Sequence, residues 1–131
     1  GEPEISETEY RENLRRIARA FKGAGIPAAW INTTHSCDAI HNGALFPGFF
    51  RFSADVETYN RYAAEVMAEA GVPVIDLNGF TRSLGADPEL FCDHVHFRDG
   101  VRREQARFLA SWIKARFPAK TGAGETKNHQ P

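Results

Sequence analysis

Residues 72–77, Val-Pro-Val-Ile-Asp-Leu, form an apolar run that is too short for a helix and typical of a buried parallel strand. A second run of this kind, Ile-Pro-Ala-Ala-Trp-Ile-Asn-Thr, lies upstream at residues 26–33, and in both runs the proline is tolerated near the beginning of a strand. Helical patterns precede, separate and follow the two runs. The order helix, strand, helix, strand, helix predicts an α/β fold with parallel strands and right-handed crossovers.

The helices are delimited by capping signals. Ser6 and Glu9 have the spacing of a capping box, and the apolar period that follows ends near Gly23 and Gly25. The second helix begins near Ala54, with Ser53 or Asp55 as its N-cap, and stops at Gly71. A short helix is expected between Gly79 and Gly85, with Asp76 capping the turn before it. The last helix opens at Gly100 and ends at Pro118, and its expected buried stripe is Val101, Gln105, Phe108, Leu109, Trp112 and Ile113.

Composition excludes several classes of protein. The chain has 131 residues, enough for one domain, and its 16 basic and 17 acidic side chains give a formal net charge of -1. There is no basic stripe for nucleic acid and no apolar stretch of the ~20 residues that a membrane span requires. The polar start is not a signal peptide, so the chain is expected to be soluble, and either a cytoplasmic or a secreted location stays open.

Two strands make an incomplete sheet. Parallel strands are normally buried on both faces, and a two-stranded parallel sheet is rarely stable alone. The strand at residues 26–33 therefore needs a neighbour, which a missing N-terminal half or a second copy of the chain could supply. We expect residues 1–118 to form this partial domain and residues 119–131, which have no apolar period, to be a disordered tail. The long irregular stretch at residues 34–53 is expected to pack over an edge or line a pocket.

Asp93 and His96 are the residues best suited to chemistry. They lie three apart in a predicted loop between a strand and a helix, where open α/β folds bind ligands. If Asp93 accepts from the Nδ1–H of His96, the carboxylate fixes the imidazole tautomer and leaves Nε2 available as a general base. From this pair alone, a surface loop with an N-cap aspartate and an incidental histidine is the better interpretation.

The surrounding sequence resembles the SGNH (GDSL-type) hydrolase family. Asp93-His-Val-His96-Phe, then Gly100 and an amphipathic helix, is similar to the last block of that family. Residues 10–17 and 25–34 resemble the helix and strand after its third block, and residues 59–77 resemble the elements before its last block. The resemblance covers about residues 8–117. It implies one part of a three-layer, flavodoxin-like parallel sheet with Asp93 and His96 as the acid and base of a Ser-His-Asp triad.

The same resemblance implies that part of the family's site is absent. The Gly-Asp-Ser block with the nucleophile, and the Gly and Asn blocks with oxyanion donors, are not present in this chain. None of its five serines has that context: Ser6, Ser36, Ser53, Ser83 and Ser111. The chain alone is therefore expected to be inactive. The implied reaction of the complete site is ester hydrolysis, with carbohydrate O-acetyl groups as one substrate class and no cofactor.

Several other residues admit competing interpretations. His94, His35 and His41 are expected to line or edge the pocket or to be exposed, although with Cys37, Asp38 and Asp93 they could also be read as a metal site. Cys37 and Cys92 could form one disulfide between neighbouring loops. The alternatives to the esterase are thus a non-catalytic or partner-dependent module and a metal-dependent hydrolase.

Overall fold

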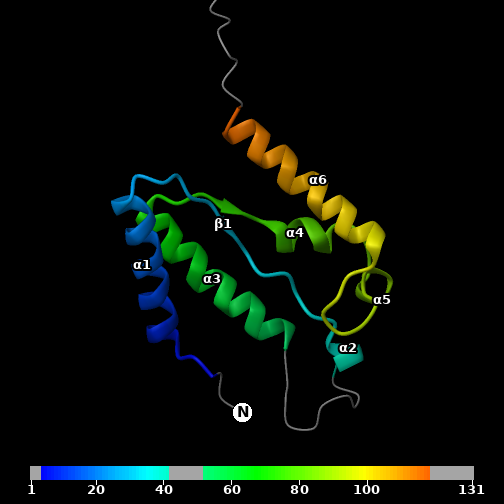
Figure 1. The fold of residues 1–131 in the computed structure, drawn as a ribbon. Helices are drawn as coiled ribbons and strands as arrows, with labels where there is room; N and C mark the ends of the chain where they lie inside the picture. The colour runs from blue at the N-terminus through cyan, green and yellow to red at the C-terminus, as the bar shows by residue number, and fades with distance from the viewer. Residues whose placement is uncertain (1–3, 42–51, 119–131) are drawn as a thin grey trace, which may run out of the picture.

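The computed structural model describes residues 4–41 and 52–118, which form helices around a small parallel sheet (Figure 1). The mixed α/β architecture expected from the sequence is confirmed at this level. The elements in chain order are α1 (Glu7–Gly23), β1 (Trp30–Ile31), α2 (Asp38–His41), α3 (Ser53–Ala70), β2 (Val74–Ile75), α4 (Leu77–Arg82), α5 (Asp87–Leu90) and α6 (Asp99–Arg116).

Strands β1 and β2 are parallel, with Trp30 opposite Val74 and Ile31 opposite Ile75. Both are shorter than the predicted runs at residues 26–33 and 72–77. The amides of Trp30 and Asn32 donate to the carbonyls of Pro73 and Ile75, so these two residues point their hydrogen-bonding groups at β2. Ile31 lies between them, and in a parallel ladder its N–H and C=O point to the opposite edge. Among the described residues no strand pairs with that edge.

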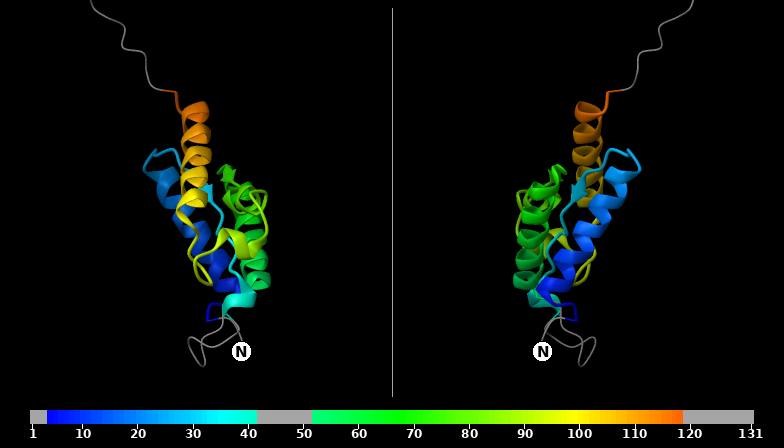
Figure 2. Two further views of the ribbon diagram at one scale, coloured as in Figure 1. Left: turned by 90° about the vertical axis from the view of Figure 1, so that its right-hand side faces the viewer. Right: turned by 90° about the vertical axis from the view of Figure 1, so that its left-hand side faces the viewer.

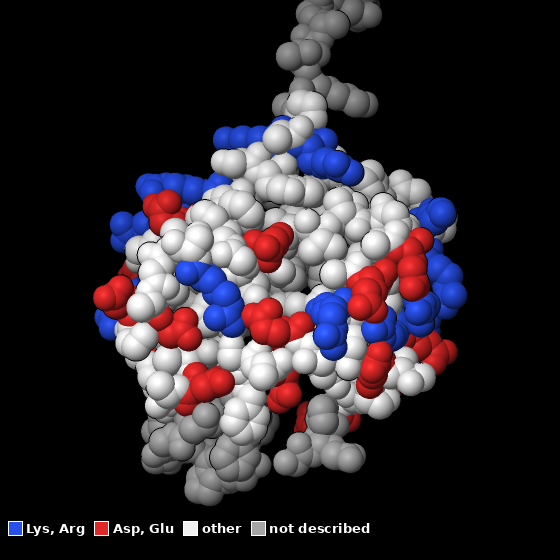
Figure 3. All heavy atoms as spheres, turned by 180° about the vertical axis from the view of Figure 1, so that it is seen from behind, with Lys and Arg blue, Asp and Glu red and all other residues white. Residues whose placement is uncertain are grey.

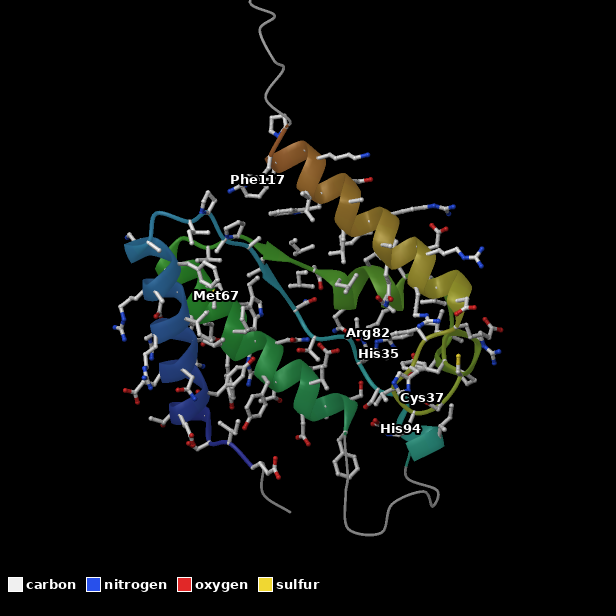
Figure 4. The ribbon with its side chains drawn as sticks, viewed as in Figure 1. His35, Cys37, Met67, Arg82, His94 and Phe117 are labelled. Carbon is white, nitrogen blue, oxygen red and sulfur yellow. The ribbon has the colours of Figure 1, made fainter. Side chains whose placement is uncertain are left out.

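Helices α1 and α3 cover one face of the sheet (Figure 1). Their contact forms a core cluster of four buried residues, Leu14, Ala63, Val66 and Met67, against which Tyr10, Trp30, Val72 and Val74 pack. Figure 4 shows Met67 in the space between the two helices. Gly71 ends α3 in the left-handed conformation, with a φ of 70°, as the stop signal predicted.

Helix caps agree with the sequence at two positions and differ at a third. The Ser6 hydroxyl accepts from the Glu9 amide at 3.2 Å, and the Asp76 carboxylate accepts from the Gly79 amide at 2.8 Å. Neither Ser53 nor Asp55 caps α3, because Phe52 occupies the N-cap and Ser53 is already helical. The Ser53 amide instead donates to the Asp38 carboxylate at 2.9 Å. The Asp38 side chain of α2 thus accepts from the first turn of α3, where a residue of α3 itself was predicted to supply the cap.

Replacing Ser6 by alanine should destabilise the chain modestly. The substitution leaves the Glu9 amide without its hydroxyl acceptor, and loss of an N-cap costs about 1 kcal/mol of unfolding free energy. Urea unfolding followed by circular dichroism measures the change, and Ser6→Asp, which restores an N-cap oxygen, is the matched control. A midpoint unchanged by Ser6→Ala would contradict the capping role.

Helix α6 packs on α4 across the other side of the strands, but it covers the sheet incompletely (Figures 1 and 2). None of its residues is buried, so the predicted stripe from Val101 to Ile113 is not the core that the pattern indicated. On the strands, Ile75 is 2% exposed whereas its neighbour Ile31 is 43% exposed. Ile31 of β1 therefore keeps an exposed apolar side chain, and Ile113 of α6 and Phe117 at its C-cap are exposed as well.

Charged side chains are mixed over the surface. On the face drawn in Figure 3, basic and acidic groups alternate and no large patch has a single sign. Such a distribution offers no extended cationic footprint on that face for a polyanion. Within residues 4–41 and 52–118, no helix combines the length and apolar character that a membrane span requires.

Candidate acid–base site

The loop that carries Asp93 and His96 is closed at its base by Phe91 and Phe97. These two residues form an antiparallel bridge, their rings lie 4.4 Å apart, and the Arg98 amide donates to the Leu90 carbonyl at 2.9 Å. Phe91 is 1% exposed and Phe97 is 8% exposed. With Cys37 and Leu90 they form a second core cluster, packed against Ile40, Leu84 and Val101. The apolar ends of the segment thus anchor a polar turn to the body of the domain.

Within this loop, Asp93 and His96 are in direct contact. His96 Nδ1 lies 2.7 Å from Asp93 Oδ2, and Asp93 Oδ1 accepts from the amides of Val95 at 2.9 Å and His96 at 2.8 Å. The carbonyl of His96 accepts from the Cys92 amide at 2.7 Å. An ionised carboxylate only accepts hydrogen bonds, so the pair places the imidazole proton on Nδ1 and leaves Nε2 as an acceptor. The His96 side chain is 76% exposed, which leaves that nitrogen accessible.

The pKa of Asp93 is held well below its usual range. The amide of Val95 is the largest cause, followed by the amide of His96 and then by the His96 ring, and all three stabilise the carboxylate. Two of the three donors belong to the backbone of the turn itself. Asp93 therefore stays ionised across the physiological pH range and holds one fixed negative charge against His96.

This hydrogen bonding predicts an acid-shifted titration of Asp93. A pKa lower in the folded than in the unfolded chain means that ionised Asp93 stabilises the turn above the unfolded value, about 4. That stabilisation is lost as the pH falls through the folded value. We expect the carboxyl carbon of Asp93, followed by NMR, to titrate well below the same carbon in the urea-unfolded chain. His96→Ala should raise the midpoint only partly, because the two amide donors remain.

The segment after β1 packs directly beneath this loop. The Cys37 amide donates to the His94 carbonyl at 2.8 Å, and Figure 4 shows His35, Cys37 and His94 close together. Beside them lies a cavity of about 440 Å³, lined by Thr33, Thr34, His35, Ser36, Phe52, Asp55, Val56 and Val95. A larger cavity of about 490 Å³ lies at the amino ends of the strands and is remote from Asp93 and His96. Ligands of open α/β folds bind at the carboxyl ends of the strands, so the cavity of about 440 Å³ is the candidate ligand site.

The predicted pocket residues are placed differently from one another. His35 lines the 440 Å³ cavity and is buried, so the interpretation of it as an exposed loop residue is wrong. From the tip of the loop Val95, and not His94, contributes to that cavity. His41 ends α2, and its side chain lies outside the described part of the structure. The rest of the predicted irregular stretch, residues 42–51, and the predicted tail, residues 119–131, also lie outside the described residues.

The two cysteines are free thiols in the structure. Cys37 is buried in the second core cluster, whereas Cys92 is exposed. The loops that carry them are adjacent, as expected, but the disulfide suggested as one alternative is not formed. Cys37 serves instead as a small apolar side chain in the cluster beneath the loop.

The predicted metal ligands other than His41, whose side chain is outside the described structure, are not gathered into one site. Across residues 4–41 and 52–118, no group of three or more His, Cys, Asp or Glu side chains is placed to hold a metal ion. His35 uses its Nε2 on Asp87 at 2.9 Å, and Asp93 uses both carboxylate oxygens inside its own turn.

The serine side chains serve structural roles where their contacts are visible. Ser6 caps α1, Ser36 Oγ donates to Asp38 at 3.2 Å, Ser53 Oγ accepts from Arg82 at 2.9 Å, and Ser83 Oγ donates to the Phe80 carbonyl. All five serines fall within the described residues, and none is hydrogen-bonded to His96. The described residues therefore place no serine hydroxyl in hydrogen-bonding contact with the pair Asp93 and His96.

Comparison with known proteins gives a relationship at the level of fold. No protein-family model and no curated protein matches the chain. A solved structure, the lipase/acylhydrolase from Enterococcus faecalis, superposes with a TM-score of 0.65 at 22% sequence identity. The match covers 87% of this chain and 54% of the lipase/acylhydrolase, so the chain spans about half the length of that protein. The chain thus has an α/β fold like part of a lipase/acylhydrolase.

Proposed function

We propose that the chain is the acid–base portion of an SGNH-type ester hydrolase with a three-layer, flavodoxin-like sheet. The observation that carries the proposal is the contact between His96 Nδ1 and Asp93 Oδ2 at 2.7 Å, in a loop fixed at both ends. The lipase/acylhydrolase fold of the neighbour supports the same reaction class. A Gly-Asp-Ser segment outside the present 131 residues supplies the nucleophile.

In this reaction His96 moves the proton and Asp93 orients His96. Nε2 takes the proton of the serine hydroxyl as Oγ attacks the ester carbonyl, and the imidazolium then returns that proton to the departing alcohol. Water repeats the sequence on the acyl-enzyme and releases the acid. The ionised Asp93, whose pKa is lowered by two backbone amides and by His96, stabilises the positive imidazolium formed in each half of the cycle.

The partner that completes the site also completes the sheet. The outer edge of β1 carries the N–H and C=O of Ile31, and the Ile31 side chain is 43% exposed. A second copy of the chain would bring the same five serines and no Gly-Asp-Ser block. The partner is therefore a different segment, which adds a parallel strand along Ile31 and carries the nucleophile on the loop after another of its strands.

The cavity beside the acid–base loop favours a polar alcohol as the leaving group. Its wall combines the hydroxyl-bearing residues Thr33, Thr34 and Ser36 and the Asp55 carboxylate with the apolar side chains of Phe52, Val56 and Val95. Hydroxyl and carboxylate groups bind the hydroxyls of a sugar, whereas small apolar side chains accept its carbon skeleton. O-acetylated carbohydrate is the substrate class that we propose first.

Extending the reading frame upstream of Gly1 tests the proposal. If the upstream coding sequence carries a Gly-Asp-Ser segment, the extended protein should hydrolyse p-nitrophenyl acetate and lose this activity on replacement of that serine. The 131-residue chain should show no hydrolysis that depends on His96. The proposal fails if an in-frame stop codon lies directly upstream and if no separately encoded chain with a Gly-Asp-Ser segment restores activity. A non-catalytic module would then be the function.

A further inference from the structure

A buried polar group lies directly beneath the acid–base loop. His35 follows β1, it is 1% exposed, and no part of its side chain reaches solvent. Burial of an imidazole is unfavourable unless its nitrogens are hydrogen-bonded. The role of His35 can therefore be inferred from the hydrogen-bond partners of its ring.

Three hydrogen-bonding contacts fix the His35 ring. Nε2 lies 2.9 Å from Asp87 Oδ1, Nδ1 lies 3.3 Å from Asn78 Oδ1, and the His35 amide donates to the same Asn78 oxygen at 2.9 Å. The orientation of the Asn78 amide is set on its other side, where Nδ2 donates to Glu57 at 2.9 Å. Both ring nitrogens of His35 therefore face oxygen atoms, one of Asp87 and one of Asn78.

The polar chain continues beyond His35 across the rim of the domain. Arg82 donates to Glu57 at 2.8 Å and to Ser53 Oγ at 2.9 Å. The pKa of Glu57 is lowered, chiefly by its hydrogen bond from Asn78 and then by that from Arg82. One continuous set of hydrogen bonds thus connects α3, α4 and α5 to the segment after β1.

The apolar edge of the His35 ring contacts both ends of the acid–base loop. Its centroid lies 5.3 Å from that of Phe91 and 6.0 Å from that of Phe97, in edge-to-face arrangements. Two residues further on, the Cys37 amide donates to the His94 carbonyl within the loop. The polar chain therefore holds the surface on which the loop rests, without touching Asp93 or His96.

We propose that His35, held by Asp87 and Asn78, is a positioning residue that keeps the loop in the conformation in which Asp93 accepts from His96 Nδ1–H. The catalytic meaning of this role rests on the proposed function, but the conformational role does not. Neither residue pair is close in sequence: His35 and Asn78 are 43 residues apart, and His35 and Asp87 are 52 apart.

The tautomer of His96 provides a direct readout. In the intact loop Asp93 selects the Nδ1–H form, whereas an imidazole without that partner favours Nε2–H. We expect ¹⁵N NMR of the neutral His96 ring to report mainly Nδ1–H in the unmodified chain. In His35→Phe, which keeps an aromatic ring but removes its hydrogen bonds, the spectrum should move toward Nε2–H. Amide protection at Cys92 should fall at least about tenfold.

Two further variants separate positioning from general destabilisation. Met67→Ala weakens the other core cluster and should leave the His96 tautomer unchanged. If His35→Phe does not fold, Asp87→Ala decides the question, because it removes the partner of Nε2 from a half-buried position. Retention of the Nδ1–H tautomer and of Cys92 protection in the folded variant would overturn the proposal. Since no substrate is involved, failure of the esterase proposal would leave this result unaffected.

Discussion

His96→Ala should abolish ester hydrolysis by the extended protein, lowering kcat on the order of 10⁴-fold or more. The substitution removes the group that takes the serine proton and returns it to the leaving alcohol. Since His96 is 76% exposed, its loss should cost little stability, so the lost activity will not reflect unfolding. Steady-state hydrolysis of p-nitrophenyl acetate, with unfolding midpoints measured in parallel, checks both statements.

Asp93→Asn tests the orienting role within the same experiment. Asp93 Oδ1 accepts from two backbone amides, so an asparagine should keep its carbonyl oxygen there and place its NH₂ group against His96 Nδ1. That arrangement selects the Nε2–H tautomer, which cannot accept the serine proton. We expect kcat to fall about 10³–10⁴-fold with little change in KM.

Asp99→Asn is the matched control for Asp93→Asn. Asp99 is an exposed acid two residues beyond the loop, paired with Arg102, and it has no contact with His96. Its replacement should leave the rate within about twofold of the unmodified protein. Equal effects of the two substitutions would show that charge near the loop, and not orientation of His96, determines the rate. Activity of the extended protein that survives His96→Ala would contradict the acid–base assignment.

The positions of the helices and strands could be predicted from the sequence, but the extent to which each element is buried by its neighbours could not. Helical periodicity and caps located α1, α3 and α6 to within a few residues, because each has a local signal. The runs at residues 26–33 and 72–77 indicated strands, yet only two residues of each form a ladder, and among the described residues each strand pairs with one neighbour. Whether α6 is buried depends on what lies opposite it, and periodicity carries no information about that.

The contact between Asp93 and His96 could be predicted because the two residues are three apart in one loop. His35, Asn78 and Asp87 form the support of that loop from distant parts of the chain, and Asn78 and Asp87 had no signal that linked them to a site. For His35 itself the sequence left three interpretations open, namely a pocket-lining residue, an exposed loop residue and a metal ligand. The burial of this ring depends on α4, α5 and two phenylalanines, which a local pattern cannot bring together.

Phe91 should be the side chain whose loss most destabilises this end of the chain. It is the largest of the fully buried side chains, it packs on Phe97 at 4.4 Å and on His35 at 5.3 Å, and it joins the bridge that closes the loop. Truncation of a buried phenylalanine removes its transfer free energy and leaves a cavity, at a cost of about 3–5 kcal/mol. Urea unfolding of Phe91→Ala measures this loss.

Phe21→Ala is the matched control, because it removes the same side chain from an exposed position. Probes at single residues then show whether the two core clusters unfold together. Phe21→Ala removes the same ring from a position 42% exposed on α1, and should cost about 1 kcal/mol or less. Phe91 is not part of the cluster between α1 and α3, so the two clusters unfold together only if the strands or the hydrogen bonds from α3 to Asn78 and Arg82 couple them. If Phe91→Ala lowers the midpoint at both Trp30 and Trp112, the domain is one cooperative unit. A loss confined to amide protection at Cys92 and Phe97 would instead make the loop an independently opening unit, held in place by Phe91 and His35.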